Sequence, residues 1–213
     1  TFPTPLKLGS MLDHSRLLAA IIALCCGLGL ASQNVATYTF AQSAGTYTAI
    51  TGGTQLWDEA DNINDETPAT VTIPAFPFAG SVYTTMYVSS NGFVTFGSAP
   101  TAGNVTPISN TATYSGAVSA FGTDLEDAST GSNTEVRWQT VGNEVVVQWQ
   151  NLERNNITGN DEVISFQIRL NTLTGAVSCV YAAVSGLENS TTDQPQVGLR
   201  GANNTFATNV NNR

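Results

Sequence analysis

Hydrophobic and polar residues alternate with a period of two along most of the chain after residue 37, which is the pattern of half-buried β-strands. The clearest case is EVISFQIRL at 162–170, in which Ile164, Phe166, Ile168 and Leu170 share one face. A polar or charged residue stands between each pair of them. The pattern predicts a strand that buries one face and leaves the other to solvent.

Two further segments, EVRWQT at 135–140 and VVVQWQ at 145–150, show the same alternation and are separated by Val-Gly-Asn. A turn of this length predicts a β-hairpin. Trp138 and Trp149 are in phase with the apolar faces, so we expect them in the core. The polar residues expected on the opposite faces are Gln139, Gln148, Gln150 and Gln167.

Other segments of the chain are compatible with short strands bounded by Gly, Asn and Thr turn signals. They lie at 37–41, 46–50, 69–73, 82–88, 92–96, 116–122, 176–182 and 195–200. Charged residues make up only 11% of the chain, and helix-forming Lys and Glu are scarce. The predicted fold class is therefore all-β, a two-layer antiparallel, jelly-roll-like sandwich of about ten to twelve short strands.

Residues 11–32 have the layout of a helical secretory signal peptide, with Arg16, an apolar run from Leu17 to Leu30, and small residues after it. The run is too short for a membrane anchor. Residues 1–10 precede the first methionine and are interpreted as an upstream, non-native extension. We expect the sandwich at 33–205, and a linker or truncated end at 206–213.

Cysteine placement agrees with export and argues against a lipid anchor. Cys25 and Cys26 lie inside the apolar run and would leave with it, and neither follows the small residue that acylation requires. Cys179 is the one cysteine after residue 32, so the exported part has no internal disulfide. Its place in a predicted strand favours a small buried hydrophobic role.

Charge excludes several classes of partner and of chemistry. Asp13 is the only acid, and Lys7 and Arg16 are the only bases, before residue 33; the rest carries 15 acids against five arginines. A nucleic-acid partner needs a basic surface, so none is expected. Residues 33–213 also contain neither histidine nor lysine. Triad, Schiff-base and His-ligated zinc chemistry are thereby excluded, and we predict a protein that is not an enzyme.

Paired carboxylates are the one catalytic arrangement that this composition leaves open. Glycoside hydrolysis requires two of them, and Glu135, Glu144 and Glu153 are candidates. Glu135 and Glu144 stand beside turns, where solvated charges are common, so surface acids are the favoured interpretation. No cofactor is expected, apart from calcium as a candidate.

Calcium is bound by loop carboxylates and carbonyls. Asp124, Glu126 and Asp127 directly follow an apolar strand and are the candidate metal ligands. A second acidic loop holds Asp58, Glu59, Asp61, Asp65 and Glu66. Neither loop has EF-hand spacing, and solvated turns are the alternative interpretation.

Trp57 is the candidate carbohydrate-binding residue. It is flanked by the polar residues Gln55, Asp58 and Glu59, which favours an exposed ring on which a sugar stacks. Packing at the rim of the sandwich is the alternative for a single Trp at the end of a strand.

Three stretches resemble a known family: YVSSNGFVTFG (87–97), YSGAVSAFGTDLED (114–127), and EVRWQTVGNEVVVQWQNLER (135–154) continuing to ISFQIRLNTLTGAVSCVY (164–181). Together with TYTFAQSAGTYTAITGGTQLW (37–57), they resemble the N-terminal β-sandwich domain of Bacteroidetes-type secreted and cell-surface proteins. That resemblance implies type IX secretion and adhesive modules further along the chain. A weaker similarity links the chain to the nidogen-type extracellular domain. Neither resemblance brings catalytic residues.

The predicted function is that of an exported, non-catalytic module for adhesion, recognition or spacing in a longer surface protein, secreted or on the cell surface. Its partner would be an extracellular protein or glycan, and no membrane anchor is expected in this segment. Two alternatives are an accessory domain of a secreted hydrolase and a calcium-dependent carbohydrate-binding domain.

Overall fold

The computed structural model describes residues 34–128, 133–155, 162–187, 194–205 and 210–212. They form twelve β-strands and two short 3-10 helices, η1 (Val35–Thr37) and η2 (Glu59–Asp61). The predicted signal peptide at 11–32 and the extension at 1–10 lie outside the described residues. Within the described residues, no helix has the length and apolar character needed to cross a membrane.

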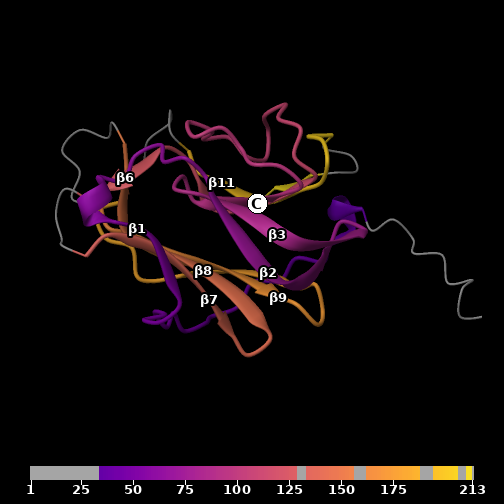
Figure 1. Cartoon of the computed structure of the whole chain (residues 1–213), viewed down its shortest axis with the longest axis horizontal. Coiled ribbons are helices and arrows are strands. Elements are labelled where there is room, and N and C mark those ends of the chain that lie inside the picture. The colour runs from indigo at the N-terminus through magenta and orange to yellow at the C-terminus, as the bar shows by residue number, and fades with distance from the viewer. Residues whose placement is uncertain (1–33, 129–132, 156–161, 188–193, 206–209, 213) are drawn as a thin grey trace, which may run out of the picture. The chain divides into compact units, whose positions relative to one another are not determined.

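The strands form two antiparallel sheets of six strands each, packed face to face (Figure 1). Sheet A runs in the order β1 (Thr54–Asp58), β7 (Glu135–Val141), β8 (Glu144–Arg154), β9 (Ile164–Asn171), β10 (Val177–Tyr181), and β6 (Leu125–Asp127) also pairs with β8. Sheet B runs in the order β12 (Val210–Asn212), β11 (Gln196–Arg200), β5 (Gly116–Gly122), β4 (Phe93–Phe96), β3 (Ser81–Ser89), β2 (Ala69–Phe78). This arrangement confirms the predicted all-β, two-layer antiparallel sandwich.

The core lies between the sheets and is made by the alternating apolar faces of the strands. Ile164, Phe166, Ile168 and Leu170 are fully buried, as their period of two predicts. Trp149 stacks on Phe166 with ring centroids 5.1 Å apart. Its Nε1 donates a hydrogen bond across the core to the carbonyl oxygen of Ser89 on sheet B, at 3.0 Å.

Two predicted strands, 37–41 and 46–50, are absent, because residues 39–51 form no strand. Instead, residues 46–52, which we call the strap, cross the outer face of sheet A. Gln148 on β8 accepts a hydrogen bond from Ile50 N at 2.9 Å and donates one to Ile50 O at 3.3 Å. A glutamine side chain thus supplies the donor and acceptor that a neighbouring backbone would supply in a sheet.

The strap also explains why two glutamines expected in solvent are buried. Gln148 and Gln167 have no exposed surface. Gln167 donates to Thr48 O at 2.9 Å and to Gln148 Oε1 at 2.8 Å, so their polar groups are paired under the strap. Their polarity is compatible with burial because it is matched by hydrogen bonds.

Within the segment predicted as a linker or truncated end, 206–213, the structure describes residues 210–212. Val210–Asn212 form β12, which pairs with β11 in regular register. Val210 is buried. β12 thus extends the edge of sheet B at β11, and the polar composition of this segment does not indicate such a strand.

Candidate binding surface

The structure brings the two acidic loops predicted from sequence together at one end of the sandwich, where β1 and β6 lie (Figure 1). Asn64 forms an isolated β-bridge with Glu126. Ile63 N donates to Asp127 Oδ2 at 3.1 Å, and Asp127 N donates to Ile63 O at 3.1 Å. The segments around residues 58–66 and 124–127 therefore form one surface, which we call the acidic end.

Asn91 links the two loops of the acidic end through hydrogen bonds of its side chain. Its buried side chain donates to Asp65 Oδ1 at 2.8 Å and accepts from Leu125 N at 2.9 Å. The next residue, Gly92, has a φ of +82°, and a Cβ there would lie 2.3 Å from the carbonyl oxygen of Phe121. Only glycine fits this turn, and the turn places Asn91 between the two loops.

Like charges repel at the acidic end. The pKa of Glu126 is raised above its ordinary value by burial first, and then by Glu153, Asp124 and Asp127. Glu153 stands directly opposite Glu126 in the β6–β8 pairing and is itself buried. These acidic side chains therefore lie close enough together to interact electrostatically.

The pKa of Asp127 is also raised above its ordinary value. Burial raises its pKa, the hydrogen bond from Ile63 N opposes that shift, and the charges of Glu59, Asp58 and Asp61 add to it. Among the described residues, no group of three or more Asp, Glu, His or Cys is arranged to hold a metal ion. Calcium binding by Asp124, Glu126 and Asp127 stays a prediction, to be tested by melting with calcium and with EDTA.

A pH titration of stability tests the raised pKa of Glu126. Because the folded state raises the pKa of Glu126, it binds the proton more tightly than the unfolded state does, and this contribution to stability falls as pH rises through the raised pKa. Glu126→Gln is therefore expected to melt higher than the wild type at pH 7, by on the order of 2 °C. The difference should vanish near pH 4. Thermal melts of the variant and the wild type from pH 4 to 8 measure the difference in melting temperature. A difference that does not change with pH would contradict the raised pKa of Glu126.

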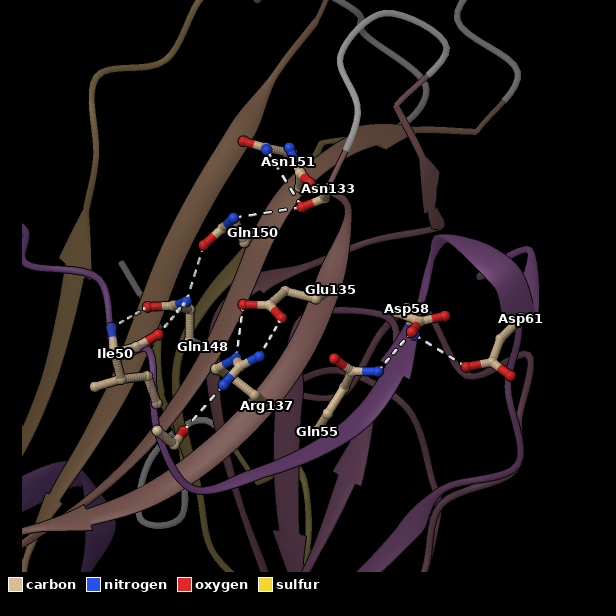
Figure 2. Close-up of polar contacts among 11 residues, drawn as sticks. Ile50, Gln55, Asp58, Asp61, Asn133, Glu135, Arg137, Gln148, Gln150 and Asn151 are labelled. Atoms are coloured by element: carbon tan, nitrogen blue, oxygen red, sulfur yellow. Dashed lines mark hydrogen bonds and ion pairs between the residues drawn. The ribbon is translucent and has the colours of Figure 1, made fainter.

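Beside the acidic end, an open depression of about 580 Å³ lies between β1, η2 and the start of β7. Its polar lining comprises Gln55, Asp58, Glu59, Asn133, Thr134 and Glu135. Figure 2 shows most of these side chains together with the hydrogen bonds that hold them. The lining contains three carboxylates, two amides and one hydroxyl group, and no basic residue.

The carboxylates of the depression are fixed by hydrogen bonds within the chain. Asp58 begins η2 with a capping box, in which Asp58 Oδ1 accepts from Ala60 N and Asp61 accepts from Asp58 N. Asp58 Oδ2 accepts from Gln55 Nε2 at 2.6 Å. Glu59 accepts from Asn133 N at 3.2 Å, which ties η2 to the start of β7.

Glu135 forms a bidentate ion pair with Arg137, whose Nη1 donates to the carbonyl oxygen of Gly52 in the strap at 3.1 Å (Figure 2). The strap is thus linked to the depression. Nearby, Gln150 and Asn151 both donate to the carbonyl oxygen of Asn133. These bonds hold the depression in one arrangement.

Trp57 lies on β1 beside the depression but does not line it. It is half-buried and packs against the core. A register shift between Gln55 and Trp57 in the β1–β7 pairing interrupts the alternation there, and this explains why the sequence did not predict β1. Carbohydrate binding by Trp57 stays a prediction.

A family model described as NIDO related matches residues 37–213. The chain belongs to the NIDO-related family. This confirms the weaker of the two resemblances, that to the nidogen-type extracellular domain, and makes the chain an extracellular-type domain. Comparison with curated proteins and with solved structures gives no match.

In this NIDO-related domain, Glu144 lies far from the other two glutamates suggested for glycoside hydrolysis. Glu144 and Glu153 are nine residues apart on β8, or about 30 Å. Glu135 pairs with Gln150, six residues from Glu144, or about 20 Å along the strand. Hydrolysis needs two carboxyl groups within about 5–10 Å.

Sequence reasoning missed two carboxylate pairs of the NIDO-related domain that are directly opposed, Asp58 with Glu135 and Glu126 with Glu153. In the first pair, all four oxygens accept hydrogen bonds from the chain. No spacing rule could have shown these pairs, because their members lie far apart in sequence.

Proposed function

We propose that the chain is a secreted or cell-surface, non-catalytic recognition module, and that its partner is an extracellular protein with a basic surface. The observation that carries the proposal is the depression at the acidic end. Asp58, Glu59 and Glu135 line it without a basic residue in the lining itself, and Glu135 is paired with Arg137 beside the depression. A cationic partner would be attracted to this surface, where burial first, and neighbouring carboxylates after it, raise the pKa values of Glu126 and Asp127.

The remaining parts of the proposal concern export and context. Residues 11–32 would direct export as a signal peptide. The resemblance to Bacteroidetes-type surface proteins supports type IX secretion and adhesive modules in the same polypeptide. The composition of residues 33–213, with neither histidine nor lysine, supports a role without catalysis.

The test is binding of the purified chain to a panel of immobilised extracellular proteins and glycans. We expect binding to a basic protein, with an affinity that falls at least tenfold between about 50 and 500 mM salt. Glu59→Gln and Gln55→Lys should each weaken it several-fold. Glu59→Gln keeps the oxygen that accepts from Asn133 N and removes only the charge.

The matched control is Gln194→Ala, an exposed glutamine outside the depression. It should bind as the wild type does. Binding only to glycans, or binding that ignores both salt and the two variants, would contradict the proposed function.

A further inference from the structure

Among the described residues, β1 and β10 end the strand order of sheet A, β12 and β2 end that of sheet B, and β6 pairs with β8 alone. All of these except β10 carry features that discourage further pairing, and β6 is only three residues long. β2 contains Pro74 and Pro77 and a register shift between Thr72 and Phe76. β1 has a register shift, and β12 is only three residues long. β10, with the sequence VSCVY, pairs with β9 in unbroken register and has neither proline nor charge. Among the described edge strands, β10 is therefore the one without a feature that discourages further pairing.

The backbone of β10 presents hydrogen-bonding groups to this open side. Asn171 N donates to Ala176 O at 2.9 Å, and Ala182 N donates to Ser165 O at 2.9 Å. Because facing residues of antiparallel strands alternate in their bonding, residues 176, 178, 180 and 182 point their N–H and C=O groups toward β9. Those of Val177, Cys179 and Tyr181 point toward the open edge.

A groove with a volume of about 750 Å³ runs along this edge. Its walls are residues 176–181, the chain at 38–45, and residues 197–199 of β11. Residues 39–51 form no strand, so the segment opposite β10 does not extend the sheet. Phe40 and Tyr181 line the groove and are 55% and 39% exposed, which is unusual for rings of this size.

The shape of the groove selects its occupant. Residues 38–45 line it together with β10, and its volume of about 750 Å³ suits one extended strand. None of its lining residues is charged, which suits an uncharged central segment. Residues 33–213 carry 15 acids against five arginines, so the chain as a whole attracts a basic partner over long range.

We propose that β10 accepts a single extended strand of a partner protein, with an uncharged centre and basic flanks, as an added strand of sheet A. The added strand would bond to the outward N–H and C=O groups of Val177, Cys179 and Tyr181. It would cover Phe40 and Tyr181. The site is independent of the depression, because β10 and β1 are opposite edges of sheet A.

The test joins a guest strand to the full chain. The guest, Thr-Val-Thr-Val-Thr-Val with two lysines on each side, follows Arg213 through a flexible Gly/Ser linker that gives about millimolar effective concentration. We expect amide hydrogen exchange at Val177, Cys179 and Tyr181 to slow at least tenfold. Exchange at Ser178 and Val180, whose amides already face β9, should change little.

The control guest has proline in place of each valine, which leaves the host unaltered and removes half of the guest's amide donors. It should give no protection. Glutamates in place of the flanking lysines should reduce the protection at low salt, and Leu173→Ser, in the exposed turn before β10, should leave it unchanged.

Three results would overturn the proposal. One is the same exchange at Val177, Cys179 and Tyr181 with both guests. Another is equal protection with acidic and basic flanks, which would show that the added strand does not need basic flanks. The third is a dimer that protects β10 amides without any guest, which would assign this edge to a second copy of the chain.

Discussion

Glu162→Ala is expected to lower the free energy of unfolding by about 3–5 kcal/mol, because it removes the buried carboxylate that pairs with a buried arginine. Arg154 donates from Nε and Nη2 to the carboxylate of Glu162, at 3.0–3.1 Å. The two side chains are only 2% and 0% exposed. Chemical denaturation of the variant and the wild type measures the difference.

Two further variants show that the loss comes from the stranded charge. Replacing both partners, as Arg154→Met with Glu162→Leu, removes the charge and should recover most of the lost stability. Glu144→Ala breaks the Arg169–Glu144 pair, whose side chains are 22% and 32% exposed, and should cost less than about 1 kcal/mol. Similar losses for Glu162→Ala and Glu144→Ala would contradict the account of the buried pair.

Trp149→Ala is expected to cost about 3–5 kcal/mol as well, for a different reason. The ring is fully buried, stacks on Phe166, and hydrogen-bonds the carbonyl oxygen of Ser89 on the facing sheet. Its removal leaves a cavity between the sheets, and the melting temperature should fall by roughly 10 °C. Differential scanning calorimetry measures the shift.

Trp138→Ala is the matched control, since Trp138 is half-buried at the margin of the core. It should lower the melting temperature by clearly less than Trp149→Ala does. An unchanged melting temperature for Trp149→Ala would refute its place at the centre of the sandwich.

Strands with regular alternation could be predicted from the sequence, and irregular ones could not. Ile164 to Leu170 on β9 follow the period of two without interruption, and they are buried as expected. On β1, the register shift next to Trp57 breaks the period, so no pattern marked that strand. Residues 46–50 of the strap were predicted as a strand. In the structure, Ile50 forms its hydrogen bonds with the side chain of Gln148 and not with the backbone of a neighbouring strand, and local composition cannot show this difference.

The candidate surface was predictable in its parts but not in its assembly. The sequence showed two acidic loops, and the structure joins them through the bridge between Asn64 and Glu126. That contact depends on the turn at Asn91 and Gly92, which brings distant segments together. The groove beside β10 was not predictable, since an edge strand and a central strand have the same local pattern.

The central claim is recognition without catalysis, and a binding experiment that follows the fate of the partner tests it most directly. The full chain is incubated with the basic extracellular protein it binds, and the partner is then recovered and weighed by mass spectrometry. The account predicts saturable binding that Glu59→Gln weakens, with the partner recovered chemically intact. Accumulation of a cleaved or modified partner beyond one equivalent of the chain would contradict it.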